Sequence, residues 1–202
     1  MDAELLRKAS GVCCLTAPIV ALSMIGLAVS EAPWFSWSED ALSDLGVGDT
    51  APIFNLGLIL GGVLLLLAAP GLAILVFKDR MARIGVALFT LACIWLACIG
   101  IFPESAGRIH FIVSVGFFTF LSLSLIVLGL AMARSKARWD RFHALLALVL
   151  GITAAVAWTL PHRGVAIPEI ISSVAGSVWI ASLGVRLLQG PWWTGPDRLG
   201  SS

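Results

Sequence analysis

Acidic, histidine and serine side chains that could perform chemistry stand at the edges of long apolar segments. Glu104 and His110 lie six residues apart across a short turn, and a carboxylate beside an imidazole raises its basicity and fixes its tautomer. Such a pair is an arrangement used for general-base catalysis. Ser43 could then act as a nucleophile, or Asp44 could help to hold a water molecule. These four residues predict hydrolysis or acyl transfer as the chemistry of a candidate catalytic site.

Other polar and aromatic residues could bind a substrate beside this catalytic set. They are Trp37, Asn55, Arg108 and His162. His110 and His162, together with Asp44 and Glu104, could instead bind a divalent metal. The chain contains no HExxH, GxSxG or HxxxH motif. We therefore assign no metal ligand, and the cofactor stays unknown.

Each candidate also has an ordinary structural explanation. Glu104 and Arg108 are spaced i, i+4 and could simply pair on the first turn of a helix. Glu169 stands at the start of the last apolar segment, where the helix dipole favours an acid. His162 follows a proline in a loop and would be exposed. The sequence leaves both interpretations open.

The composition places these residues in a membrane protein. The chain has 202 residues, of which 59% are hydrophobic and 12% charged, whereas soluble domains carry about 25% charged residues. This excludes a soluble enzyme, a secreted disulfide scaffold and a disordered chain. The net charge of +1 offers no basic excess for nucleic acid. The expected partner is the lipid bilayer.

Six apolar segments predict an all-α bundle of transmembrane helices, since a span needs about 20 apolar residues. They cover about 9–30, 51–77, 84–103, 107–133, 142–160 and 167–188. Short loops leave no room for a soluble module, so residues 1–202 form a single transmembrane domain. The first segment is longer than the 7–15 apolar residues of a signal peptide. We expect it to be retained as a span.

The distribution of Lys and Arg predicts the orientation. The N-terminus, the second and fourth loops and the C-terminal end carry eleven of the 13: Arg7, Lys8, Lys78, Arg80, Arg83, Arg134, Lys136, Arg138, Arg141, Arg186 and Arg198. The other loops carry only Arg108 and Arg163. Because cytoplasmic loops are enriched in cations, we expect a cell-membrane protein with both termini cytoplasmic. The candidate site residues then share the extracytoplasmic mouth.

The first external loop contains the run SWSEDALSDLG, which is typical of a short interfacial helix. Ser36 or Ser38 would cap this helix and Gly46 would end it. Its apolar side chains, Leu42 and Leu45 among them, would lie on the bilayer while its acids face water. A surface lid that merely connects two spans is the alternative, because Ser, Asp and Gly are common in turns.

Small residues recur one helical turn apart on two of the spans. Gly57 and Gly61 lie on the second span, and Ser172 and Gly176 on the sixth. Such faces let helix backbones approach closely. They could serve packing within the bundle or a homodimer.

Four motifs carry a family resemblance over nearly the whole chain. They are SDLG (residues 43–46), FNLGL (54–58), FPE (102–104) and then His110. Their order resembles the uncharacterised prokaryotic membrane family called domain of unknown function 998. The resemblance implies six spans and a polar external site, with no established activity. The chain departs from an acid–Arg pair on the last span, where it has Val185–Arg186.

The Ser-Asp-x-Gly element before the second span is also similar to eukaryotic membrane proteins of the FRAG/DRAM/Sfk group, which includes lipid-anchor remodelling factors. Three functions therefore stay open. The first is a multi-pass membrane protein whose outer polar site binds or processes a lipid; if it is an enzyme, it would be a lipid hydrolase or acyl transferase. The second is a non-catalytic accessory or assembly factor. The third is a small transporter, which would need polar groups at mid-membrane depth.

Overall fold

The computed structural model describes residues 3–75, 79–134 and 138–190, and within these ranges it is helical without β-strands. The six long helices are α1 (Ala3–Ser30), α2 (Ala51–Leu75), α3 (Arg80–Ile101), α4 (Arg108–Ala133), α5 (Arg138–Ala157) and α6 (Ala166–Gln189). Three short 3-10 turns are η1 (Leu42–Gly46), η2 (Gly48–Thr50) and η3 (Glu104–Ala106). The expectation of an all-α chain is confirmed.

Five of these helices are long and apolar enough to cross a membrane. The fifth in chain order, α5, is shorter, because its apolar part runs from Arg141 to Ala157. The sequence predicted a span to residue 160, but the helix ends at Ala157 and a turn follows before Pro161. The protein is thus a multi-pass membrane protein with five to six apolar helices.

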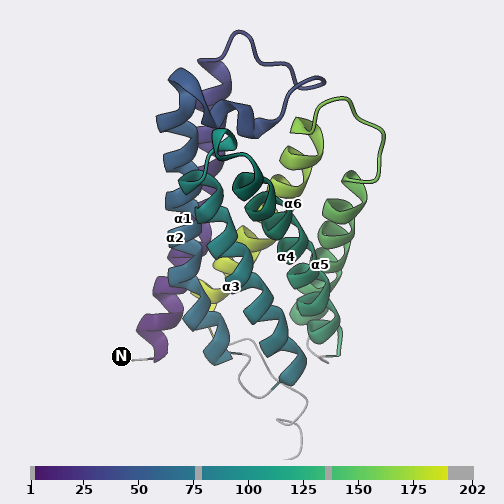
Figure 1. Ribbon diagram of the computed structural model, residues 1–202. Helices are drawn as coiled ribbons and strands as arrows, with labels where there is room; N and C mark the ends of the chain where they lie inside the picture. The colour runs from purple at the N-terminus through teal and green to yellow at the C-terminus, as the bar shows by residue number, and fades with distance from the viewer. Residues whose placement is uncertain (1–2, 76–78, 135–137, 191–202) are drawn as a thin grey trace, which may run out of the picture.

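The helices form a closed ring in chain order (Figure 1). Each packs against the next along the chain, and α1 also packs against α6. Large apolar side chains such as Leu67, Phe111 and Leu145 point outward and are exposed, whereas Leu125 and Leu183 are buried inside. An apolar exterior is the expected surface of a protein whose solvent is hydrocarbon.

The small-residue faces bring helices of the same chain together. A Cβ atom on Gly57 would lie 2.7 Å from the Cβ of Met24, and one on Gly61 would lie 3.1 Å from that of Ala21. The α1–α2 contact therefore depends on glycine at both positions. Gly176 on α6 likewise faces Leu121 on α4. These residues serve packing within the bundle.

An ion pair joins α3 and α4 at the end of the bundle where the N-terminus lies (Figure 1). Asp79 accepts a hydrogen bond from the Ala82 N–H at 2.8 Å and so caps α3. Both Asp79 oxygens also accept from Nη2 of Arg134, at 2.9 and 3.0 Å. A cation at the C-terminus of α4 also complements its helix dipole.

Candidate functional site

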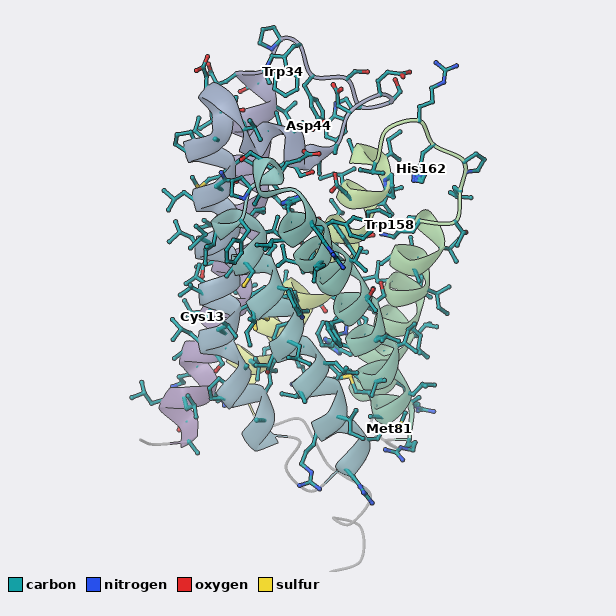
Figure 2. The ribbon with its side chains drawn as sticks, in the orientation of Figure 1. Cys13, Trp34, Asp44, Met81, Trp158 and His162 are labelled. Atoms are coloured by element: carbon teal, nitrogen blue, oxygen red, sulfur yellow. The ribbon has the colours of Figure 1, made fainter. Side chains whose placement is uncertain are left out.

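The loop after α1 folds over the opposite end of the ring, where Figure 2 shows Asp44, Trp34 and His162. The continuous helix expected over residues 36–46 is not present, because turns occupy residues 37–39 and η1 begins at Leu42. Leu42 is 3% and Leu45 0% exposed, so both side chains face the protein interior and not the bilayer. We call residues 41–47 the lid.

Side-chain acceptors explain why this loop forms turns. The Asp44 carboxylate accepts from the Ala41 N–H at 2.7 Å, and the Asp40 carboxylate accepts from the Ser36 N–H at 2.7 Å. Such local bonds compete with helical hydrogen bonding. The Thr50 hydroxyl also donates to the Leu45 carbonyl at 2.8 Å, which ties the lid to the start of α2.

The loop is also paired with the chain that leads into α6. The Gly164 N–H donates to the Ser38 carbonyl, and the Ala166 N–H donates to the Asp40 carbonyl, each at 2.9 Å. These two bonds join segments that are far apart in the sequence. The lid therefore depends on long-range contacts as well as on its own turns.

Carboxyl groups from three separate elements lie near one another at the lid. Glu169 on α6 is 7% exposed, and its Oε2 accepts from the Leu42 N–H at 2.6 Å. The Ser43 hydroxyl donates to Oε2 of Glu104 on η3 at 3.3 Å. Asp44 and Glu104 also interact through their carboxyl groups. The structure thus brings Ser43, Asp44 and Glu104 together as the sequence suggested, and adds Glu169.

The pKa of Glu104 is raised from its ordinary value to about 7. Burial is the largest cause, followed by the hydrogen bond to the Asp44 carboxyl group and then the charge of Asp44. The Ser43 hydroxyl acts in the opposite direction, because it donates to the ionised carboxylate. Glu104 and Asp44 therefore form a carboxyl pair in which Glu104 keeps its proton more readily than a free carboxyl group does.

This pair predicts that the lid loosens as the pH rises. The folded lid holds the Glu104 proton with a pKa of about 7, against 4.5 for the unperturbed group. Its contribution to lid stability is fully present below pH 4.5, declines as the pH rises towards 7 and is absent above that range. Amide hydrogen exchange of the lid, corrected for intrinsic rates, should therefore accelerate between pH 5 and pH 8, a window set by the ordinary and shifted values.

Two variants test the assignment of that pH dependence. Glu104→Gln should weaken the pH dependence of corrected lid exchange over this window, because the titration of Glu104 is gone. Asp49→Asn, on the exposed η2 turn beside the lid, should keep the wild-type profile. A Glu104→Gln protein whose lid keeps the full wild-type pH dependence would contradict the role of this pair.

The hydrogen-bond partners of His110 are not the carboxyl groups. Its Nδ1 lies 2.8 Å from the Phe102 carbonyl oxygen, and its Nε2 lies 3.2 Å from the Ser114 hydroxyl. Because a carbonyl only accepts, Nδ1 carries the proton and Nε2 accepts from Ser114. No hydrogen bond joins His110 to Glu104 in the described residues. His110 links the end of α3 to α4 and is not positioned as the base for Ser43.

Asn55 binds the lid from α2. Its Nδ2 donates to the Gly46 carbonyl at 3.0 Å, while its Oδ1 is buried without a partner among the described residues. A Cβ atom on Gly46 would lie 2.7 Å from that Oδ1. Asn55 therefore requires glycine at the end of η1 and positions the lid.

The remaining candidates lie outside the cluster. His162 is exposed on the α5–α6 loop, and Trp37 is exposed with its ring edge-on to Phe35 at 5.2 Å between centroids. Arg108 is exposed at the start of α4, and the described residues show no ion pair between it and Glu104. Across the part of the chain that the structure describes, no three His, Cys, Asp or Glu side chains form a potential metal group.

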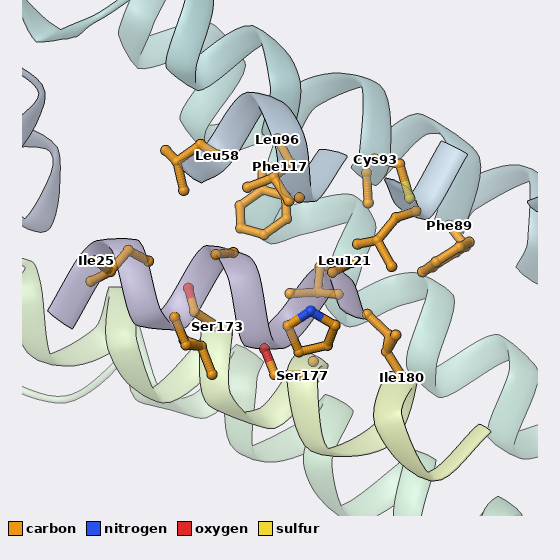
Figure 3. A pocket seen from close by; sticks show the side chains of 18 residues that line it. Ile25, Leu58, Phe89, Cys93, Leu96, Phe117, Leu121, Ser173, Ser177 and Ile180 are labelled. Atoms are coloured by element: carbon orange, nitrogen blue, oxygen red, sulfur yellow. The ribbon is translucent and has the colours of Figure 1, made fainter. Parts of the chain in front are cut away.

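Two adjacent cavities lie between the lid and the middle of the ring. The upper cavity, of about 30 Å³, is lined by the lid residues Leu42 and Ser43 and by Glu169. The lower cavity, of about 50 Å³, lies among α1, α2, α3, α4 and α6 (Figure 3). Both share the lining residues Ile25, Leu58, Leu96, Phe117 and Ser173. Both cavities are lined mainly by apolar side chains, and the upper one also carries the carboxyl group of Glu169.

One wall of this space carries a row of polar groups. Glu169, Ser173 and Ser177 follow one another at one-turn spacing on α6, and Figure 3 shows both serines at the lower cavity. The Ser173 and Ser177 hydroxyls make no hydrogen bond to the described residues. Other helical hydroxyls, such as those of Thr90 and Ser182, donate to carbonyls of their own helix. The α6 serines therefore remain able to bind whatever enters the cavity.

Glu169 is the site residue that sequence reasoning missed. Its place at a helix start already had a sufficient local explanation in the helix dipole. The available signal was its spacing to Ser173 and Ser177, which puts all three side chains on one face of the helix. That spacing could have marked an interior polar row leading away from the external loop.

Comparison with known protein families matches residues 15–186 to the family described as protein of unknown function (DUF998). No curated protein matches the chain. No solved structure matches it either. The match covers most of the chain, including every helix that contributes to the site. This multi-pass membrane protein therefore belongs to the DUF998 family.

Proposed function

We propose that the protein binds a single-chain amphiphile, with the polar head beneath the lid and the hydrocarbon chain in the interior of the ring. One observation carries this proposal: the two adjacent cavities have Ser43 and Glu169 in the lining at the lid and mainly apolar side chains along the rest. Ligand sites generally combine an apolar pocket with a few placed polar groups. An amphiphile complements both parts of this space.

The same proposal includes an orientation in the cell membrane. The described cations Arg7, Arg83, Arg134 and Arg141 lie at the helix ends opposite the lid. The positive-inside tendency then puts both termini in the cytoplasm and the lid outside. A lipid would enter from the outer leaflet.

Entry of a chain requires the lid and the helices near it to move. The cavities of about 30 and 50 Å³ have room for a few water molecules, whereas even a benzene-sized cavity measures about 150 Å³. The structure thus corresponds to a closed state. Displacing Leu42 and Leu45, which are buried beneath the lid, is the most direct way to enlarge the space.

Filling the cavity tests this function. Dodecanol supplies a neutral head and one chain, and its retention can be measured by native mass spectrometry of protein released from nanodiscs. Ser173→Phe places a ring where both cavities meet and should reduce retention at least about tenfold, a change of about 1.4 kcal/mol. Val174→Phe is the matched control, because Val174 is exposed on the outer face of the same helix.

The pair of variants separates interior binding from surface binding. Equal loss in both variants, or equal retention in both, would show that the interior cavity does not hold the chain. Retention in Val174→Phe with loss in Ser173→Phe is the expected result. Thermal unfolding of both proteins checks that the added ring leaves the bundle folded.

Hydrolysis or acyl transfer is a second candidate, favoured by the contact between the Ser43 hydroxyl and Glu104. Attack of Ser43 Oγ on an ester carbonyl would pass the hydroxyl proton to Glu104, which then protonates the departing alcohol. Water would release the acid from the acyl-serine in a second step and restore Ser43.

Esterase activity tests this second candidate directly. If Ser43 is the nucleophile, wild-type protein in nanodiscs should hydrolyse p-nitrophenyl laurate, and Ser43→Ala should lose at least about a hundredfold in rate. Ser38→Ala, an exposed serine on the same loop, should behave as wild type. No turnover by wild type, or equal rates for wild type and Ser43→Ala, would leave binding as the only proposal.

A further inference from the structure

Glu169 is a buried carboxyl group that has no cationic partner among the described residues. It is 7% exposed, and its hydrogen bond comes from the backbone N–H of Leu42. No Lys, Arg or His of the described residues pairs with it. A buried ionised carboxylate is strongly unfavourable unless an opposite charge or several donors compensate it.

The charged groups around Glu169 do not supply a positive charge either. Glu169 is the one charged residue among those that line the two cavities. The nearest charged groups on the neighbouring elements, Asp44 on the lid and Glu104 on η3, have the same sign. Arg163, the cation of the adjoining loop, pairs instead with Glu39 at 3.2 Å. Among the described residues Glu169 thus has no positive partner, and a cation that entered the cavity would supply one.

We propose that the head of the bound amphiphile is a primary ammonium that pairs with Glu169 beneath the lid. This inference rests on the proposed function and names the class of its ligand. Hydrogen bonds between an ammonium and a carboxylate are among the stronger ones in proteins. An anionic head would instead meet Asp44, Glu104 and Glu169, all of the same charge.

The α6 serines supply the remaining acceptors that an ammonium needs. An ammonium has three N–H donors, and Glu169 can satisfy only part of them. Ser173 lies one turn below Glu169 in the upper cavity, and its hydroxyl makes no hydrogen bond to the described residues. Ser43 lines the same cavity from the lid. Together Glu169, Ser173 and Ser43 supply the upper cavity with oxygen atoms that can accept hydrogen bonds from a compact cation.

A comparison of two probes with equal chains tests the ammonium. Dodecylamine and dodecanol differ only in the head group, and the amine is protonated at neutral pH. Native mass spectrometry gives the ratio of amine to alcohol retained by each protein from phosphatidylglycerol nanodiscs. Comparing this ratio between wild type and Glu169→Gln cancels the different partitioning of the probes into the bilayer.

The wild-type protein should favour the amine over the alcohol at least about tenfold more than Glu169→Gln does. Glutamine retains an oxygen that accepts from the Leu42 N–H, so this variant keeps the lid contact. Ser173→Ala, which removes one neutral acceptor, should lower the preference by a smaller factor. Equal amine preference in wild type and Glu169→Gln would overturn the proposal.

Further arms of the experiment separate its possible failures. If neither probe is retained by wild type, the proposed function itself fails. If both are retained with no dependence on Glu169, amphiphile binding stands and the ammonium assignment fails. Replacing the free amine by lysophosphatidylethanolamine, which also has one chain, distinguishes the source: retention of this lipid identifies a phospholipid head, and exclusion of it identifies a simple long-chain amine.

Discussion

Replacing Gly164 by alanine is expected to destabilise the protein by about 2–3 kcal/mol. A Cβ atom at this position would lie 2.3 Å from the carbonyl carbon of Glu39 and 2.4 Å from the carbonyl oxygen of Asp40. Both are backbone atoms, so no side-chain rotation relieves the overlap. The two segments must separate, and the hydrogen bonds from Gly164 and Ala166 to the loop are lost. Thermal unfolding in detergent measures the effect.

The matched control is Gly26→Ala. Gly26 lies within α1, and a Cβ atom there meets nothing within 4 Å. This substitution should leave the unfolding temperature unchanged or raise it, because alanine favours helix over glycine by about 1 kcal/mol. Equal unfolding temperatures for the two variants would contradict the tight pairing of the lid loop with the entry to α6.

Substitutions of Glu169 should separate its hydrogen bond from its charge. Glu169→Leu leaves the Leu42 N–H buried without its acceptor, which should cost about 1–3 kcal/mol of stability. Glu169→Gln keeps an acceptor and removes a buried carboxyl group that has no cationic partner among the described residues. In the absence of amphiphile, its unfolding temperature should therefore equal or exceed that of the wild type.

The same unfolding experiment can disprove this interpretation. If Glu169→Gln is as unstable as Glu169→Leu, the charge itself is compensated within the chain, and a ligand cation is not required. If Glu169→Leu unfolds at the wild-type temperature, the contact between Leu42 and Glu169 does not hold the lid. We predict that the unfolding temperature of Glu169→Gln equals or exceeds that of the wild type, and that the unfolding temperature of Glu169→Leu is lower than both.

The helices were predictable because each long apolar segment satisfies its backbone within one helix, as hydrocarbon requires. Their ends were less predictable. α5 stops at Ala157, whereas its apolar pattern continues to Leu160. The following Pro161 restricts the residues before it and favours a helix end there. The shorter helix agrees with that local constraint better than with hydropathy.

The lid could not be predicted, because hydropathy does not distinguish a side chain facing lipid from one facing the protein interior. Leu42 and Leu45 were assigned to the bilayer from their apolar character, and they are buried under the lid. The contact of Gly164 with Ser38 joins loops that are far apart in the sequence. No local pattern encodes such a contact.

The candidate site was predictable in part. Ser43 and Asp44 share one short turn, so any fold that brings Glu104 to one of them brings it near both. His110 was assigned to Glu104 by proximity in sequence, but its Nδ1–H binds the Phe102 carbonyl at the end of α3. Carbonyls at a helix C-terminus lack helical partners and accept nearby donors. Nδ1 of His110 therefore binds this carbonyl group and not a carboxyl group.

The location of the hydrocarbon chain tests the central claim most directly. A dodecylamine with a diazirine in the middle of its chain can be photo-crosslinked to the protein in nanodiscs, and the modified residues can be identified by mass spectrometry. Interior binding predicts labelling of cavity residues such as Phe117 and Ser177, suppressed by excess unlabelled dodecylamine. Labelling confined to outward residues such as Phe111 and Val178, and insensitive to competitor, would contradict it.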